Sequence, residues 1–189
     1  NQTNSEPIEK TLKDYFPENI LVGVAINQWH VECGLDSSKQ ELPLAPKFEN
    51  QAITKHFNCV TAENCMKSEV INPQKGVFDF TLAYQFVEYA KKNNLTIIGP
   101  SPIWHSQQAP WFCFEDDGKT LVCKDTLKQR IKDHIFAVMG RYKGIIKGYD
   151  VVNEGIEDDG SYRNSFMYQI MGEEWIDWSF ECAMQADPD

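Results

Sequence analysis

The sequence predicts an α/β fold with a parallel sheet. Short apolar runs of strand length alternate with stretches in which apolar residues recur at helical spacing, an order typical of strands buried beneath helices. Polar residues follow directly after several of these runs. Because the chemistry of parallel α/β folds gathers where the strands end, this arrangement predicts a functional site at the carboxyl ends of the strands.

The N-terminal part predicts two helices and two strands. An apolar run over 20–26 is the first strand, a helix includes 48–56, and 58–61 is the second strand. Before the first strand, apolar residues recur at helical spacing at Ile8, Leu12, Tyr15 and Phe16.

Two more helix–strand pairs and a last helix follow. A helix that Asp79 or Thr81 can cap ends at the asparagines of 93–94, and strands are predicted over 96–98 and 148–153. The resulting order, β-α-β-α-β-α-β-α, is that of half a barrel. The apolar faces of its later helices are Leu82, Phe86, Tyr89 and Ala90, then Leu127, Ile131, Ile135 and Val138, and last Trp175, Ile176, Phe180 and Ala183.

The fourth predicted strand ends in an amide and a carboxylic acid, Asn153 and Glu154. Val151 and Val152 before them predict a buried strand. A glutamic acid held at such a strand end in a partly apolar wall can act as a general acid, as glycosidases require. The competing interpretation is a carboxylate that caps the next loop.

Segments in and beside the predicted strands carry a family resemblance. They are 56–67 (HFNCVTAENCMK), 104–107 (WHSQ), 141–144 (RYKG), 149–154 (YDVVNE) and 158–163 (DDGSYR). In this order and spacing they resemble glycoside hydrolase family 10, the xylanase family of (β/α)8 barrels. The resemblance runs from about Phe16 to Pro188, and agreement over several long motifs is far more specific than one short pattern.

The resemblance implies a (β/α)8 TIM barrel. Residues 1–189 would form the N-terminal half of the catalytic domain, with strands one to four and their helices. A complete barrel needs about 250 residues. The family's nucleophile, near the end of strand seven, would then lie outside this segment, and the remaining half of the barrel is an expected partner.

The resemblance also implies roles in a retaining endo-β-1,4-xylanase, which hydrolyses internal bonds of xylan. Glu154 matches the general acid/base, and Asn153 matches the amide that hydrogen-bonds the 2-hydroxyl of the reacting sugar. Structural alternatives are a strand-end salt bridge between Glu63 and Lys67, and Trp104 as an ordinary core residue. The remaining matches bind substrate: Glu63, Asn64 and Lys67 on the glycone side, and Trp104, His105 and Gln107 beside the reacting ring. We expect convergence at one end of the strands for Glu63, Lys67, Trp104, Gln107 and Glu154.

Three positions depart from the family pattern. Pro100 stands where the family has a sugar-contacting histidine, Tyr149 where tryptophan is usual, and Tyr84 where aspartate is common. Proline has no side-chain donor, so one hydrogen bond to the reacting sugar would be absent. The alternative function is therefore a catalytically impaired or altered-specificity relative that binds xylan or another β-linked plant polysaccharide. A plain structural fragment is a third alternative.

The composition argues against several classes of partner. A net charge of −10 disfavours nucleic acid, whose phosphates repel acidic surfaces, and suits a neutral partner such as xylan or a xylo-oligosaccharide. The longest apolar run, 20–26, is far shorter than the roughly 20 residues of a membrane span. The sequence shows no signal peptide, while the family implies a secreted, periplasmic or cell-surface location. No cofactor or metal is expected, because Asp158 and Asp159 lack the spaced run of ligands that calcium requires.

The six cysteines include no C-x-x-C pair, which argues against zinc and thioredoxin chemistry. Cys113 and Cys123 flank a turn signal at 115–118, and they are either free or joined by a disulfide in an exported protein. Buried thiols are expected at Cys59, Cys65 and Cys182.

Overall fold

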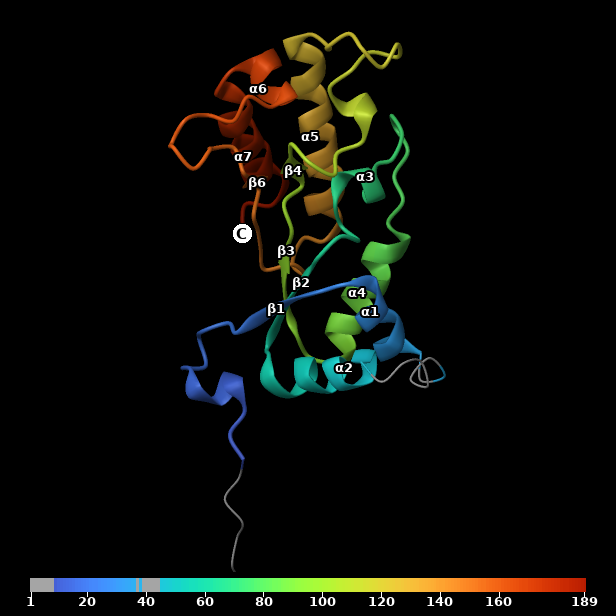
Figure 1. Cartoon of the computed structure of the whole chain (residues 1–189), viewed down its shortest axis with the longest axis vertical. Coiled ribbons are helices and arrows are strands. Elements are labelled where there is room, and N and C mark those ends of the chain that lie inside the picture. The colour runs from blue at the N-terminus through green and yellow to red at the C-terminus, as the bar shows by residue number, and fades with distance from the viewer. Residues whose placement is uncertain (1–8, 37, 39–44) are drawn as a thin grey trace, which may run out of the picture.

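The strands form a parallel sheet in the computed structural model, which describes residues 9–36, 38 and 45–189. Strands three and four each continue past a break as β4 (Ile103–Trp104) and β6 (Val152–Asn153), which pair with each other (Figure 1). Every pairing between these strands is parallel, as predicted. The main sheet has the order β1-β2-β3-β5, formed by Gly23–Ile26, Cys59–Ala62, Thr96–Gly99 and Gly148–Tyr149.

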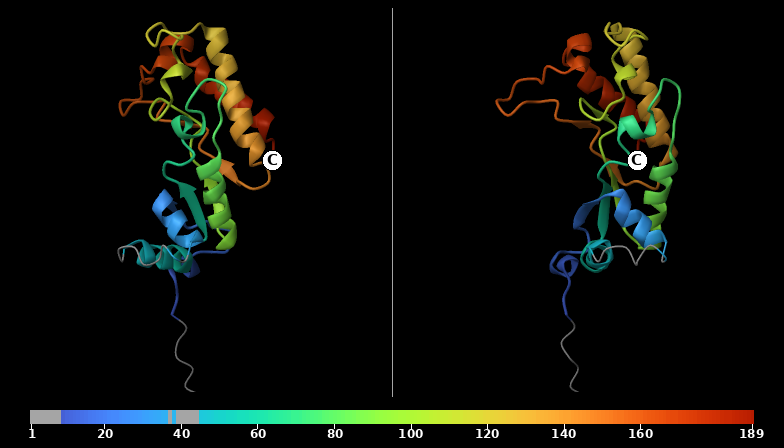
Figure 2. Two further views of the ribbon diagram at one scale, coloured as in Figure 1. Left: turned by 90° about the vertical axis from the view of Figure 1, so that its right-hand side faces the viewer. Right: turned by 45° about the vertical axis from the view of Figure 1, so that its right-hand side comes forward.

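Helices connect and cover these strands. Helix α5 packs along α7, whereas α1 packs against α2 and α4, and Figure 2 shows the two groups at opposite ends of the molecule. The N-cap position of α4 is Phe80 and not Asp79 or Thr81, but the Asp79 carboxylate accepts a 2.9 Å hydrogen bond from the Thr81 N–H at the start of the helix. The bounds are α1 Gln28–Leu35, α2 Ala45–His56, α3 Ser68–Ile71, α4 Thr81–Lys92, α5 Lys124–Arg141, α6 Phe166–Met171 and α7 Glu174–Ala186.

Strand three contains an extra residue at the break that separates β3 from β4. Gly99 pairs with Tyr149 and Ile103 pairs with Val152, so strand three advances four residues while strand four advances three. An extra residue of this kind is a β-bulge, which bends its strand and re-aims the side chains beyond it. The bulge therefore sets the direction in which β4 leads to the candidate site.

A serine hydroxyl supplies hydrogen bonding inside the bulge. Pro100 and Pro102 have no N–H to donate, but the buried Ser101 hydroxyl lies 2.8 Å from the carbonyl oxygen of Ile103 and 3.2 Å from that of Val151. These contacts tie the bulge to strand four.

Two hydrophobic clusters hold the helices on the strands. The first includes Ile26, Val60 and Ile97 from β1, β2 and β3 together with Phe86 from α4. The second joins Ile103 of β4 to α5, α6 and α7. The predicted apolar face of α5 is fully buried, at Leu127, Ile131, Ile135 and Val138.

The predicted face of the last helix is only partly buried. Trp175 and Ala183 are buried, but Phe180 is 45% exposed. Phe180 and Met184 line a cavity of about 480 Å³ beside β5, which is the last strand of the sheet within the described residues. Exposed apolar side chains therefore lie beside a sheet edge that is unpaired within the described residues.

The predicted N-terminal helix is wrong for the described residues. One turn of 3₁₀ helix covers Leu12–Tyr15, and its apolar side chains are exposed, as is Phe16. Ile8 lies outside the described residues. The first strand is also shorter than predicted, at Gly23–Ile26. Helical spacing alone did not produce a helix here, because a short helix without a buried face is marginal in water.

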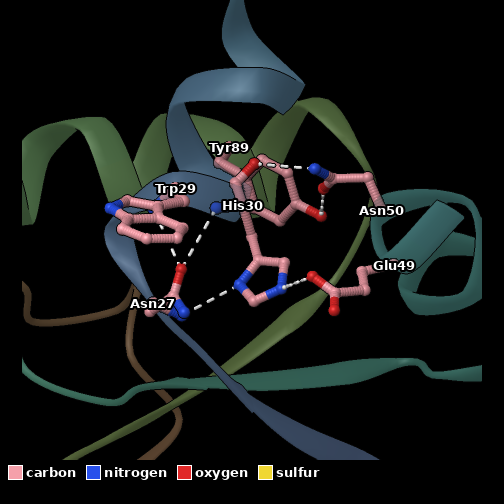
Figure 3. A network of polar contacts seen from close by, with 6 residues as sticks. All are labelled: Asn27, Trp29, His30, Glu49, Asn50 and Tyr89. Carbon is pink, nitrogen blue, oxygen red and sulfur yellow. Dashed lines mark hydrogen bonds and ion pairs between the residues drawn. The ribbon is translucent and has the colours of Figure 1, made fainter. Parts of the chain in front are cut away.

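Helix α1 is present although the apolar pattern does not predict it, and polar contacts hold it (Figure 3). The Asn27 side-chain oxygen accepts from the N–H groups of Trp29 and His30, at 3.0 and 3.4 Å. The Asn27 N–H donates to Nδ1 of His30 over 3.1 Å. A neutral His30 therefore carries its proton on Nε2, which lies 2.9 Å from the Glu49 carboxylate on α2.

The same network joins α1 to α4. The Tyr89 hydroxyl donates to the side-chain oxygen of Asn50 over 2.6 Å, and the Asn50 amide donates to the His30 carbonyl over 3.0 Å. Gly34 allows this close approach, because an added Cβ would lie 2.2 Å from the Tyr89 ring.

Cys113 and Cys123 are both free thiols and are not joined by a disulfide. The predicted turn between them is present, since Phe114 forms an antiparallel bridge with Leu121. Burial raises the pKa of Cys113 to about 12, whereas Cys123 is exposed, with Sγ 3.2 Å from the Thr126 hydroxyl. The expected burial is confirmed for Cys59, Cys65 and Cys182.

Candidate active site

The predicted site residues lie at the ends of β2, β4 and β6 or shortly after them. Trp104, the last residue of β4, pairs with Asn153, the last residue of β6. Glu154 is the next residue after Asn153. The Glu63 N–H donates to the Ile26 carbonyl over 2.9 Å, which extends the β1–β2 pairing to the end of β2. Parallel pairing thus brings the carboxyl ends of these strands to one end of the sheet.

Glu154 lies beside two ring nitrogens, and one of them donates a hydrogen bond to it. The indole Nε1 of Trp104 donates to Oε2 of Glu154 over 2.9 Å. Nε2 of His105 lies 3.7 Å from the same oxygen. The Glu154 side chain remains about half exposed, so its carboxyl group is accessible from solvent.

Lys67 completes one side of this cluster. Its ammonium group lies 4.6 Å from the centre of the Trp104 ring, a cation–π contact. Burial lowers the pKa of Lys67, while the carboxylates of Asp150 and Glu154 oppose that shift. The salt-bridge alternative is not observed, because no ion pair in the described part of the chain joins Glu63 to Lys67.

An amide pair joins β2 to the loop after β4. The Gln107 amide donates to the side-chain oxygen of Asn64 over 2.9 Å. Gln107 has a φ of +47°, a left-handed conformation that few residues with side chains adopt, and its carbonyl accepts from the Glu69 N–H over 2.9 Å. Glu63 is exposed beside Asn64.

His105 favours the neutral state in this site. Burial lowers the pKa of His105 and the Arg163 guanidinium lowers it further, against the opposing effect of Glu154 and Glu157. Its Nδ1 is buried without a hydrogen-bond partner among the described residues. A neutral imidazole beside Glu154 can donate or accept one hydrogen bond.

The sequence is similar to a known protein family and to individual proteins of that family. It matches the model of glycosyl hydrolase family 10 over residues 11–189. The chain belongs to this family. It is similar to endo-1,4-beta-xylanase A of Xylanibacter ruminicola, with 42% identity over 96% of this chain and 46% of that relative.

Solved structures of the family have the same fold. A psychrophilic family 10 endo-beta-1,4-xylanase has a TM-score of 0.83 and 34% identity, over 96% of this chain and 53% of that chain. The intracellular xylanase of Thermoanaerobacterium saccharolyticum has a TM-score of 0.81 and 34% identity, and the match covers 97% of this chain and 55% of that chain. The chain therefore spans about half the length of these proteins, and its parallel strands with their helices form about half of a (β/α)8 barrel.

One contact of Glu154 was not predicted. Nε of Arg163 donates to the carbonyl oxygen of Glu154 over 2.8 Å, and Nη2 lies 3.0 Å from the Glu157 carboxylate. The available signal was the turn sequence of 158–163, which folds the chain back toward Glu154. Asp159 forms this turn by accepting from the N–H and hydroxyl of Ser161.

The main departure from the family 10 pattern is buried. Pro100 lies inside the bulge of strand three, where its side chain supplies no donor. Tyr149 packs over Gly99, and a Cβ on Gly99 would lie 2.3 Å from its ring. The tyrosine therefore needs glycine opposite it.

Proposed function

We propose that the protein containing this chain is a retaining endo-β-1,4-xylanase in which Glu154 is the general acid/base. The main support is the position of Glu154 at the end of β6, with one carboxyl oxygen bonded by Trp104 over 2.9 Å. Membership of family 10, and the name endo-1,4-beta-xylanase of a relative 42% identical, support xylan as the substrate.

Hydrolysis with retention needs two carboxyl groups about 5–5.5 Å apart. Glu154 would protonate the leaving oxygen and later take a proton from the attacking water. A second carboxylate would attack the sugar and form the covalent intermediate. We propose that this nucleophile comes from the remaining half of the barrel, outside residues 1–189.

The neighbouring side chains would hold the substrate. Asn153 would hydrogen-bond the 2-hydroxyl of the reacting sugar, a contact that strengthens at the transition state. The amides of Asn64 and Gln107, only 2.9 Å apart, and the ammonium group of Lys67 offer donors to adjacent hydroxyl groups. Trp104 would form an apolar wall beside the ring. Glu63 and His105 complete the proposed set.

The second candidate is a binding protein with impaired or altered catalysis. Pro100 favours it, because a donor is absent where the family has histidine. The intact pair of Asn153 and Glu154 favours the enzyme. The two candidate functions predict different outcomes with xylan: the enzyme cleaves it, whereas the binding protein binds it with little or altered cleavage.

Release of reducing ends from linear xylan by the full-length protein tests the proposal. We expect internal cleavage to oligosaccharides, with the β-anomer appearing first by NMR because the mechanism retains configuration. Xylan binding without release of reducing ends would support the binding protein instead. Initial formation of the α-anomer would contradict the retaining mechanism.

An exported location is also part of the proposal, since a polymer substrate lies outside cells. A structure similar to this chain is described as an intracellular xylanase, so family membership does not decide the location. Among the described helices, none is both long and apolar enough to cross a bilayer. Fractionation of the source cells, with the chain detected by antibody, tests the location directly.

A further inference from the structure

Glu154 has an uncommon backbone conformation for a residue with a side chain. Its φ is +52°, in the left-handed region, which a Cβ atom disfavours. Outliers of this kind persist where the surrounding contacts hold them, and they cluster at functional sites. The contacts that hold Glu154 in this conformation therefore bear on its function.

The packing after Glu154 explains why the chain turns there. Gly155 is buried against α7, where an added Cβ would lie 3.1 Å from Ile176 and 3.4 Å from Trp175. A side chain at this position would force these two neighbours to shift, so glycine suits the close approach of the chain to the helix. The turn at Glu154 leads the chain into that contact.

Arg163, at the end of the loop that follows Glu154, contacts the main chain of Glu154. Residues 155–163 fold back as a hairpin, and the N–H of Arg163 donates to the Gly155 carbonyl over 2.9 Å. Nε of the guanidinium donates to the main-chain carbonyl of Glu154 over 2.8 Å. Nη2 makes a 3.0 Å ion pair with Glu157, which fixes the orientation of the guanidinium plane.

We propose that Arg163 is a positioning residue that holds the Glu154 backbone in its left-handed conformation and so keeps the carboxyl group aimed beside Trp104. The inference rests on the proposed function of Glu154. Arg163 bonds the main chain of Glu154, so the carboxyl group remains available for proton transfer. A guanidinium suits this task because its planar fork engages a carbonyl and a carboxylate together, whereas an ammonium group lacks that geometry.

Two substrates that differ in their leaving group can distinguish a positioning role of Arg163 from general structural support. Acid assistance matters for the sugar alcohol released from xylan, whereas dinitrophenolate leaves without a proton. In the full-length protein we expect Arg163→Met to lower kcat/KM on xylan by about 10–100-fold, because a misplaced catalytic group costs rate steeply. On 2,4-dinitrophenyl β-xylobioside, kcat/KM reports the first bond cleavage and should fall by less than about three-fold.

Two further variants sharpen the comparison. Arg163→Lys keeps the charge and should lose less activity on xylan than Arg163→Met, and it replaces Arg163→Met if the latter does not fold. Arg141→Met removes an arginine from the groove between α4 and α5 and should leave the ratio of the two substrates unchanged.

Equal losses on both substrates, or an unchanged rate on xylan, would overturn the positioning role while leaving the proposed function intact. A wild-type protein that cleaves neither substrate would overturn the proposed function and this inference together. The supporting result is a loss of kcat/KM in Arg163→Met that is large on xylan and small on the dinitrophenyl substrate, with no such difference in Arg141→Met.

Discussion

The indole nitrogen of Trp104 donates a hydrogen bond to Oε2 of Glu154 over 2.9 Å. The two residues come from neighbouring parallel strands, and the pairing of Trp104 with Asn153 fixes their separation. A fixed donor leaves the carboxyl group less freedom to rotate, which favours proton transfer along one direction. Trp104 therefore has a polar role beside its apolar face.

Replacing Trp104 by phenylalanine tests this polar role. Trp104→Phe keeps an aromatic wall and removes the N–H donor, so we expect kcat on xylan to fall by about 2–10-fold, the worth of roughly one hydrogen bond, with little change in KM. Steady-state kinetics of the full-length protein measure both constants. Trp29→Phe, on the exposed side of α1, is the matched control, and equal effects of the two changes would contradict the role.

Replacing Glu154 by glutamine removes the transferable proton and keeps the shape. We expect hydrolysis of xylan to fall by roughly 10²–10⁴-fold or more, the usual worth of general acid assistance, while xylan binding is largely retained. Reducing-sugar assays and affinity electrophoresis measure the two effects. A Glu154→Gln protein with full activity would remove Glu154 from the acid role.

The sequence predicts the strands and the later helices well because burial imposes an apolar pattern on them. The α5 face illustrates this, since Leu127, Ile131, Ile135 and Val138 are all buried. Helix α1 shows only a short apolar pattern, because its eight residues bury just Val31 and Cys33, and polar contacts from Asn27, His30 and Glu49 add to its packing. Contacts between side chains distant in sequence carry no periodic signal.

The sequence likewise predicts one part of the candidate site and not the other. Strand ends followed by polar residues predict which segments approach, and the structure brings Lys67, Trp104 and Glu154 together. The bond between Gln107 and Asn64 depends on a left-handed turn at Gln107, and the contact of Arg163 depends on the fold of its loop. Backbone turns of this kind follow from tertiary packing, which local sequence does not specify.

The bulge in strand three should depend on one hydroxyl group. Ser101→Ala removes the donor near the carbonyls of Ile103 and Val151, both in a buried setting. We expect the free energy of unfolding to fall by about 1–3 kcal/mol, the cost of leaving a buried acceptor without its partner. Urea unfolding measures the change. Ser106→Ala, farther along the same loop, is the control and should cost distinctly less.

A buried histidine should make stability depend on pH. His134 lies between Phe78 and Phe112, with ring centroids 6.4 and 6.0 Å away, and burial lowers its pKa to about 4 from 6.5. Between these values the unfolded chain binds a proton that the folded chain does not. The free energy of unfolding therefore falls as the pH drops from about 6.5 to about 4, by roughly 3 kcal/mol.

His134→Leu should remove this part of the pH dependence. Urea unfolding at several pH values between about 4 and 7 measures it, with Phe136→Leu, a change of the non-titrating and 37% exposed Phe136 on the same helix, as the control. The slope of the free energy of unfolding against pH should flatten in His134→Leu and persist in the control variant. Identical slopes in both variants and the wild type would show that His134 does not titrate as expected.

Restoring a donor at Pro100 tests the clearest departure from family 10. Proline cannot donate to a sugar hydroxyl, and it fixes its own φ near roughly −65°. The Ser101 hydroxyl lies against the carbonyls of Ile103 and Val151 and does not depend on the side chain at 100, so Pro100→His should preserve the bulge. We expect kcat/KM on linear xylan to rise a few-fold, by about 0.5–1.5 kcal/mol, the worth of one hydrogen bond. Pro100→Phe relaxes the backbone equally without a donor, so it separates the hydrogen bond from relief of the loop. An unchanged or lower value for the histidine variant would mean that Pro100 belongs to a site reshaped for a decorated or different sugar.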